Sequence, residues 1–435
     1  MSKHWTLGRL LLLTVAAMMI SAGSSASENP SLLDEDAVIE DYLAYAALNN
    51  PGLKAAFQSW HAALEEIPQV SALPDPRFNY SYLIREVETR VGPQRQKFAL
   101  LQTFPWFGKL DLKGDRAARM AEAGRQRYES AKRKLFYKVI DAYVERAYLD
   151  RAIDVASENL DLAKYLEQVV RSRYKTGASS HSDLIRAQVE RGKLEDRLAS
   201  LKDLTGPSNT RLNSALGRSA GAPLPGNLAI PTGSLEVDSK ELIKQLVEEN
   251  PDLLTLDELS ESHRLSMDLA RKQFRPDFTL GIEYMETGEA LMPDQPDTGK
   301  DPVAAMFSIN LPIWRGKYRA AENQAASLAL SADLTRRDRE LDLVSRLERA
   351  LFAYRDAERK TALYRDNLIP QGRQALSVTE EAFKAGKVGF TSLVDSQRIL
   401  LEFQLNYERA RADRAQRLAE IEMLAGSATK GTSNE

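Results

Sequence analysis

Cysteine is absent from this 435-residue chain. The sequence therefore has no disulfide, no thiolate nucleophile, no cysteine metal ligand and no cysteine to carry an N-terminal lipid. Beyond its N-terminus it also lacks any apolar run near the ~20 residues that a transmembrane helix needs. Charged residues make up 28% of the chain but nearly cancel, leaving a net charge of −3. Nothing in this balance resembles a nucleic-acid-binding surface, so no nucleic-acid partner is expected.

Enzyme motifs are missing as well. The sequence has no Gly-x-Ser-x-Gly elbow, no phosphate-binding glycine loop and no His-Glu-x-x-His helix. Met285, Met292 and Met306 could offer soft ligands to copper or silver, but methionines at such positions are more often filler. We therefore expect no catalytic residue, no cofactor and no resident metal site.

The N-terminus has the pattern of an export signal. Lys3 and Arg9 lie before or at the edge of an apolar stretch, residues 10–20, and small residues at 24–26 form a cleavage site. About eleven apolar residues are too few to cross a bilayer, which argues against a membrane anchor. We expect residues 1–26 to be a signal peptide, so that the mature protein leaves the cytoplasm.

The sequence contains two very long helix-forming stretches. Residues 109–176 lack proline, and their glycines, Gly114 and Gly124, lie near the start. One unbroken helix of this length would extend roughly 100 Å, too far for a compact core. Apolar residues at alternating steps of four and three, interrupted by Arg146 and Glu167, predict a coiled-coil seam: Leu135, Val139, Ala142, Leu149, Ile153, Ala156, Leu160, Ala163 and Val170.

A second stretch, residues 318–385, repeats this design. It differs from the first by an interior proline, Pro370, which removes a backbone donor, so we expect a bend there. Its predicted seam comprises Leu343, Leu347, Ala350, Tyr354, Ala357, Tyr364 and Leu368.

Two other segments change to a period of two, which is typical of strands. Residues 77–104 alternate Phe78, Tyr80 and Tyr82 with small or polar residues, and residues 277–312 do the same. Each segment predicts a hairpin with one apolar face. Strands of about nine or ten residues would cross a bilayer when tilted.

The chain is an internal duplication. Asn50-Pro51 returns as Asn250-Pro251, and Pro76-x-Phe78 returns as Pro276-x-Phe278, each 200 residues later. The repeat predicts these domains: a first unit at 27–216 (hairpin 77–104, long helix 109–176, return helix 182–216), a linker at 217–233, a second unit at 234–425 (hairpin 277–312, long helix 318–385, return helix 391–425) and a disordered tail at 426–435.

Four strands cannot close a barrel, and lipid does not tolerate open sheet edges. We therefore expect several copies of the chain to share one barrel, joined to a hollow bundle of helices. The alternative from another class is a periplasmic coiled-coil scaffold protein whose strands form a soluble sheet.

The order of these motifs is similar to that of a known family. The duplicated helix–hairpin–helix plan, the Pro-Trp-Phe-Gly-Lys sequence at residues 105–109, and the ends Tyr174-Lys175-x-Gly177 and Phe383-Lys384-x-Gly386 resemble TolC-type outer-membrane efflux proteins. The resemblance covers about residues 30–425. Its Pro-Trp-Phe-Gly-Lys version looks most like the heavy-metal efflux subgroup, although many metal-type relatives carry a lipidated cysteine.

The resemblance implies a mainly α fold with a β-barrel portion. Long antiparallel coiled-coil helices would form a periplasmic tunnel, and four strands per protomer would join a trimeric, twelve-stranded barrel in the outer membrane of a Gram-negative bacterium. The implied partners are two further copies of the chain, a periplasmic adaptor, an inner-membrane transporter and outer-membrane lipid. The function would be the passive exit duct of a tripartite efflux system for small toxic compounds or metal cations. The alternative within this architecture is a type I protein secretion duct.

In the resemblance, the turns at the ends of the long helices form the periplasmic tip that meets the adaptor. Glycine there also simply ends a helix in a left-handed conformation, and both explanations can hold together. The expected adaptor-contact residues are Lys175, Gly177, Ser179, Ser180, Lys384, Gly386 and Lys387.

Acidic residues beyond these turns are candidates for a channel gate. Asp183 follows Gly177 by six residues and Asp395 follows Gly386 by nine, while Ser392 holds the six-residue position of the second repeat. In the family, carboxylates at these spacings in the second repeat ring a constriction, and three copies of Asp395 would bias conduction toward cations. The alternative is helix capping, with Ser392 to Asp395 resembling a capping box; for Asp183 we favour capping.

Three aromatic residues, Trp106, Phe107 and Trp314, lie where strand passes into helix. Such side chains prefer the membrane–water interface. Packing at a strand–helix corner is an almost equal explanation.

Overall fold

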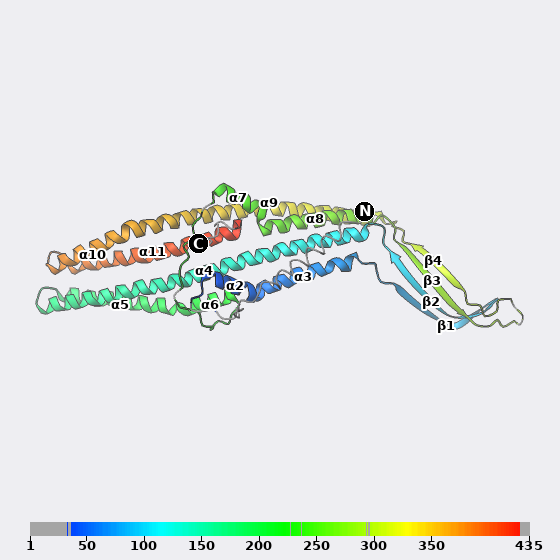
Figure 1. Cartoon of the computed structure of the whole chain (residues 1–435), viewed down its shortest axis with the longest axis horizontal. Helices are drawn as coiled ribbons and strands as arrows, with labels where there is room; N and C mark the ends of the chain where they lie inside the picture. Colours follow the sequence, from blue (N-terminus) through cyan, green and yellow to red (C-terminus); the bar gives the residue numbers. More distant parts are fainter. Residues whose placement is uncertain are drawn as a thin grey trace, which may run out of the picture.

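The computed structural model describes residues 33, 36–226, 228–235, 237–292, 294 and 296–426. The expected signal peptide, 1–26, and residues 427–435 of the expected tail lie outside this range. Within it the molecule is elongated, with long helices at one end and a sheet at the other (Figure 1). No helix in the described ranges is long and apolar enough to cross a membrane.

Both repeats follow the same order of elements. The first contains α2 (Ile39–Asn49), α3 (Pro51–Ser71), β1 (Arg77–Thr89), β2 (Gly92–Phe104), α4 (Lys109–Lys175), α5 (His181–Asp203) and α6 (Thr205–Leu216). The second contains α7 (Ser239–Glu249), α8 (Pro251–Lys272), β3 (Phe278–Thr287), β4 (Val303–Ile309), α9 (Arg315–Leu363), a π-helical turn η1 (Tyr364–Leu368), α10 (Ile369–Lys384) and α11 (Phe390–Ala425).

Several boundaries differ from those expected. The return helix expected over 182–216 is divided at Leu204 into α5 and α6. The strands are not uniform in length, since β1 and β2 have 13 residues each while β3 has 10 and β4 has 7. The segment expected as one helix over 318–385 begins earlier, at Arg315, and is interrupted by η1.

The π turn lies immediately before Pro370. The N–H of Ile369 donates to the carbonyl of Tyr364, five residues back. Proline has no N–H to continue the ladder, so the helix widens for one turn and resumes as α10 with Pro370 in its first turn.

The predicted seam of α4 forms most of its buried face. Eight of the nine seam residues are buried, and Ile153 is half-buried. The two polar interruptions are paired: Glu167 is only 4% exposed and accepts from Arg171 and Arg191. Arg146 donates to Asn209 and forms an ion pair with Asp150. Polar residues at seam positions therefore contact specific polar or charged neighbours.

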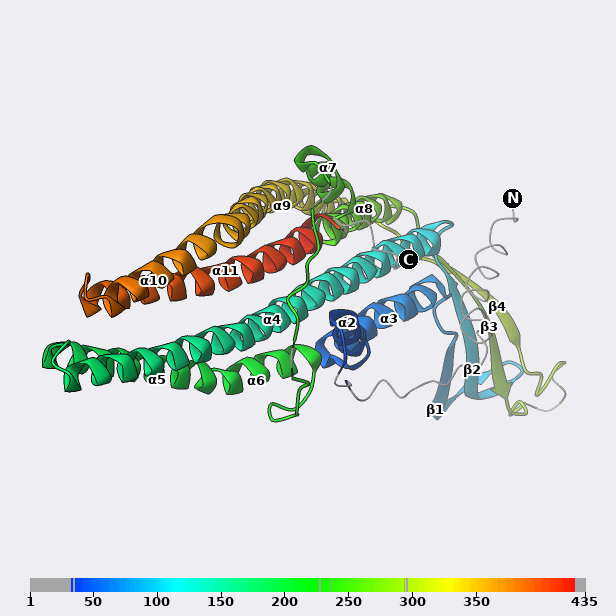
Figure 2. The same ribbon diagram turned by 60° about the vertical axis from the view of Figure 1, so that its left-hand side comes forward.

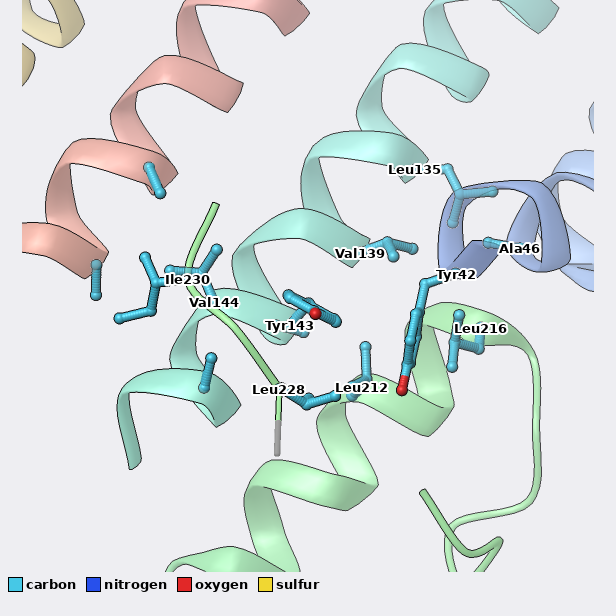
Figure 3. Packing of buried hydrophobic residues seen from close by; sticks show 14 of the residues in the cluster. Tyr42, Ala46, Leu135, Val139, Tyr143, Val144, Leu212, Leu216, Leu228 and Ile230 are labelled. Carbon is cyan, nitrogen blue, oxygen red and sulfur yellow. The ribbon is translucent and has the colours of Figure 1, made fainter. Parts of the chain in front are cut away.

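A compact core lies midway along the helices, where α2 and α6 pack on α4. Tyr42 and Tyr143 contact edge to face with ring centroids 5.0 Å apart. Figure 3 shows the segment containing Leu228 and Ile230 passing over the same cluster. The linker between the repeats is therefore part of this core. Figure 2 shows that it crosses α4 on its way to α7.

The four strands form one antiparallel sheet in the order β1-β2-β3-β4. The two repeats join through β2 and β3, with Leu100 opposite Ile282 and Phe104 opposite Phe278. Within the described residues, strands β1 and β4 each have a neighbour on one side only. The chain thus presents a sheet with two free edges.

Candidate functional site

One face of the sheet is apolar over most of its length, with Gln102 as its polar interruption. The register places three apolar rows across it, each drawn from neighbouring strands: Tyr80, Phe98, Tyr284 and Val303; Phe78, Leu100, Ile282 and Ala305; Phe104, Phe278 and Ile309. Most of these side chains are exposed in the single chain, including Phe78 at 65% and Ile282 at 62%. The other face carries mostly small or polar residues, such as Asn79, Ala99 and Glu283 in one row. This alternation suits lipid on one side and water on the other.

Polar side chains bound the apolar face. At one end Tyr80 donates from its hydroxyl to Gln96 at 2.9 Å, and Gln96 in turn donates to Glu286. From Gln96 to Phe104 the strand rises ~26 Å, close to the ~25 Å apolar band of membrane barrels. Gln102 lies within the band, but its amide donates to the carbonyl of Pro74 at 2.8 Å.

The three expected interface aromatics lie at the opposite end of the sheet from Gln96. Phe107 and Trp314 are both 75% exposed, and Trp106 contacts Phe107 at a ring distance of 6.0 Å. Phe107 also lies 6.3 Å from the ring of Phe278. Packing at the strand–helix corner does not explain Phe107 and Trp314 well, because it leaves most of the surface of both side chains exposed. Their role at a membrane interface stays a prediction.

A buried ion pair joins the sheet to the helices. Lys109 Nζ lies 2.7 Å from Asp277 Oδ1 and donates to the carbonyl of Arg275 at 2.8 Å, and Lys109 is only 6% exposed. The same carboxylate oxygen accepts from the backbone N–H of Trp106 at 2.8 Å. Asp277 thereby fixes the start of α4 against the start of β3. The sequence singles out Lys109 only as part of a motif, and Asp277 was not predicted.

The two helix turns at the far end have the same geometry. Gly177 and Gly386 have φ angles of 72° and 73°. In each turn the next N–H bonds back five residues, Ala178 to Arg173 at 2.8 Å and Lys387 to Ala382 at 2.9 Å. These are paired Schellman caps, which need the left-handed conformation that glycine adopts most easily. Except for half-buried Ser179, the expected contact residues Lys175, Gly177, Ser180, Lys384, Gly386 and Lys387 are exposed.

Arg173 connects these two turns and was not anticipated. Its Nη1 donates to the carbonyl of Lys384 at 2.5 Å, its Nη2 donates to Ala178, and its guanidinium lies 5.0 Å from the centre of the Phe383 ring. Since Arg173 belongs to α4 and Lys384 to α10, one side chain holds both tips together. The only sequence signal is its place directly before Tyr174-Lys175-x-Gly177.

The three expected gate residues have different environments. Asp183 forms a capping box with Ser180, accepting from its N–H at 3.2 Å while Ser180 accepts from the N–H of Asp183 at 3.1 Å. The capping box suggested for Ser392 and Asp395 is wrong, because α11 begins at Phe390 and its cap, Gly389, has no side chain. Asp395 thus lies in the second turn with its side chain 57% exposed, 3.8 Å from Arg398.

A stronger contact holds Arg398 beside this position. Its guanidinium donates to both carboxylate oxygens of Glu190, linking α11 to α5. Burial raises the pKa of Glu190, but hydrogen bonds from Arg398 and Lys193 outweigh it and hold the pKa below its usual value. Glu190 therefore remains ionised at neutral pH. Neither residue was predicted, because the contact joins helices more than 200 residues apart in sequence.

Comparison with known proteins matches both repeats. Residues 43–218 and 242–427 fit the family model described as outer membrane efflux protein. The chain belongs to the outer membrane efflux protein family. The two matched segments follow the duplication of the chain. The match confirms the expected outer-membrane location and the expected role in efflux. The long helices and the four-stranded antiparallel sheet confirm the expected mainly α fold with a β portion.

Individual relatives are distant. The pyoverdine export outer membrane protein OpmQ of Pseudomonas putida is 23% identical over 73% of this chain and 66% of its own length. The cobalt-zinc-cadmium resistance protein CzcC of Cupriavidus metallidurans is 23% identical, over 85% of each chain. The crystal structure of the outer membrane protein VceC from Vibrio cholerae has a TM-score of 0.74 and 15% identity, covering 89% of this chain and 96% of that one. This last likeness bears on the fold of the efflux protein alone.

Proposed function

We propose that three copies of this efflux protein form a passive duct, closed at its helical tip and opened by a periplasmic adaptor. The observation that carries the proposal is the sheet, which has an exposed apolar face and two free edges. Unpaired backbone groups cannot face lipid, so β4 of one copy must pair with β1 of the next. Three copies give twelve strands, enough to leave a water-filled passage.

Exposed apolar residues on the outer helices support the same association. Helix α8 packs between α4 and α9, and α3 packs on the other side of α4. This order leaves α3 and α9 as the two edges of the row. Both edges carry exposed apolar side chains that a neighbouring copy would cover: Phe57 and Leu64 on α3, and Leu328, Leu330, Leu334, Leu341 and Phe352 on α9.

The tip is proposed to provide the gate and the adaptor contact. Asp395 is exposed and has a single ion-pair contact among the described residues, the 3.8 Å approach of Arg398. Three copies of this carboxylate around one axis would repel one another, bind cations and restrict flow. Ser392 lies one turn earlier on α11. Asp183 is engaged in its capping box, so it contributes to the fold of the turn and is not expected to face a partner charge.

The cargo is proposed to be small toxic compounds or metal cations. The names of two relatives, one for pyoverdine export and one for cobalt, zinc and cadmium resistance, support delivery by an inner-membrane transporter that selects the substrate. No resident cofactor or chemical step is needed for a duct. The protein is therefore proposed to be a conduit and not an enzyme.

Planar-bilayer conductance tests the gate. The purified wild-type trimer should show small, cation-preferring conductance, which should rise in Asp395→Ala and lose part of its cation preference. Asp183→Ala is the matched control, since it removes a carboxylate at the corresponding turn of the first repeat. If Asp395→Ala leaves conductance and cation preference unchanged, the gate assignment fails. If the mature protein is monomeric and soluble without detergent, the duct itself is excluded.

A further inference from the structure

A positively charged cavity lies where α4 of the first repeat packs against helices of the second repeat. It has a volume of about 250 Å³ and is bounded by α4, α9, the start of α8 and the end of α11. Five of its lining residues are Lys or Arg: Arg133, Lys134, Lys138, Arg339 and Arg346. A second cavity of about 470 Å³ shares Lys134 and Arg339 with it and adds Arg127.

Among the residues that the structure describes, Asp252 is the one carboxylate that lines this cavity, and it is already engaged. Asp252 accepts from Ser130, from Lys134 at 3.0 Å and from Arg339 at 2.8 Å. It therefore draws α4 and α9 toward the same side of α8. The charge of Asp252 partly neutralises Lys134 and Arg339, and the other three cations of the cavity form no ion pair with it within the described ranges.

The remaining cations have no partner in the described part of the chain. Lys138 and Arg346 form no ion pair there, and Nη1 of Arg133 is buried without a hydrogen-bond partner. Glu249 and Glu129 lie near enough to Arg133 to act on it electrostatically, but neither forms an ion pair with it in the described residues. A buried guanidinium nitrogen without an acceptor is costly. Three unpaired cations around one cavity also repel one another.

The backbone adds to this positive field. Helix α8 starts at Pro251 on the wall of the cavity, and the N-terminal end of a helix carries a partial positive charge. Side-chain guanidinium and ammonium groups with a helix N-terminus are the elements from which proteins build sites for phosphate and sulfate. A metal cation would be repelled from the same place.

We propose that this cavity binds a multivalent oxyanion of the phosphate or sulfate type. The anion would bridge Arg133 and Lys138 of α4 to Arg346 of α9, in front of the first turn of α8. It would thereby fasten three helices next to Asn250, whose side-chain amide donates to the carbonyl of Leu424 on α11. The site is separate from the helical tip and does not depend on the proposed gate.

Titration of the full-length protein in detergent with inorganic phosphate tests the proposal. Phosphate should bind saturably and raise the thermal unfolding temperature, whereas sodium chloride at matched ionic strength should not. Arg346→Gln and Lys138→Gln should each weaken phosphate binding at least tenfold. Neither substitution breaks an ion pair of the described chain, so both variants should fold and keep wild-type conductance.

Arg349→Gln is the matched control. Arg349 is an exposed cation on the same helix, has no ion pair in the described residues and does not line the cavity. Its substitution should leave phosphate binding unchanged. Absence of saturable binding, or equal weakening in Arg346→Gln and Arg349→Gln, would show that the cavity is not an anion site. Neither result would bear on the duct, which the bilayer experiment tests separately.

Discussion

The side-chain amide of Asn250 donates a 2.8 Å hydrogen bond to the carbonyl oxygen of Leu424. Its Oδ1 accepts at the same time from the backbone N–H of Asp252 at 2.9 Å, capping α8. Asn50 makes the equivalent pair of bonds in the first repeat, capping α3 and donating to Ala215 at 2.9 Å. Each asparagine therefore accepts from a backbone N–H at the start of one helix and donates to a backbone carbonyl at the end of another. This explains why Asn-Pro occurs at the same place in both repeats.

Replacement of Asn250 by alanine should destabilise the protein by about 1–3 kcal/mol, because it removes a cap and a buried hydrogen bond. Asn250 is only 5% exposed, whereas Asn50 is half-buried, so Asn50→Ala should cost less. Asn250→Asp keeps the capping acceptor but replaces the donor to Leu424 by a carboxylate oxygen that faces a carbonyl oxygen, so it should also destabilise the protein. Thermal unfolding in detergent, monitored by circular dichroism, measures the loss of stability in each variant. Equal losses for Asn250→Ala and Asn50→Ala would contradict this account.

Lys109→Met should destabilise the junction of sheet and helices by about 2–4 kcal/mol, since it leaves the carboxylate of Asp277 without its cation. Lys317 is the matched control, because it holds the corresponding place in the second repeat but is exposed and has no ion pair in the described chain. Lys317→Met should change stability by less than about 0.5 kcal/mol. The measurement is again the unfolding of the purified protein. A similar effect of both substitutions would show that burial of Lys109 is unimportant.

Acid should weaken the contacts of Asp252. Burial raises the pKa of this carboxyl group, but hydrogen bonds from Ser130, Arg339 and Lys134 outweigh it and lower the pKa to about 2. A group whose pKa is lower in the folded than in the unfolded protein stabilises the fold at pH values above its unfolded pKa. This contribution is lost as the pH falls toward the folded pKa. The stability difference between wild type and Asp252→Asn should therefore be ~1–2 kcal/mol at neutral pH, after allowance for partial exposure, and shrink between about pH 4 and pH 2. A difference that stays constant over this range would exclude the linkage.

Pro370→Ala should convert the π turn to regular α-helix, because the new N–H can donate to the carbonyl of Asp366. Electron cryo-microscopy of the trimer would show the change in residues 364–368. Gly372→Ala is a useful comparison, since it also favours helix but its Cβ would lie 3.3 Å from Phe403 Cδ2 on α11. It should keep the π turn and disturb the packing of α10. A π turn that persists in Pro370→Ala would show that tertiary contacts, and not proline, maintain it.

The local sequence pattern was enough to predict the helices and strands but not the contacts between them. The seam of α4 was predicted because Leu135, Val139 and the residues that follow repeat with the helical period. Where prediction depended on the start of a helix it was less successful. The Ser-x-x-Asp pattern of Ser392 and Asp395 predicts a capping box at a helix start. Instead, Phe390 is buried against Phe383 with ring centroids 5.8 Å apart, which extends α11 past Ser392.

The charged contacts at the two ends of the helical region could not be predicted from local pattern either. Lys109 and Asp277, Glu190 and Arg398, and Arg173 and Lys384 are each separated by more than 160 residues. Each pair includes ordinary charged residues in a chain that is 28% charged. Their partners could be identified only after the helices were placed side by side.

By itself the sequence determined the duplication, the long helices, the strand faces and the family, because periodicity and repeated motifs are local properties that survive in one dimension. Only the tertiary structure decided which charges meet. It also decided that both Asn-Pro motifs join stacked helices, and that five cations surround one cavity. These relationships depend on the rotation and register of helices that pack together. The sequence of one helix, with its period of 3.6 residues, does not determine how that helix is rotated or shifted against another.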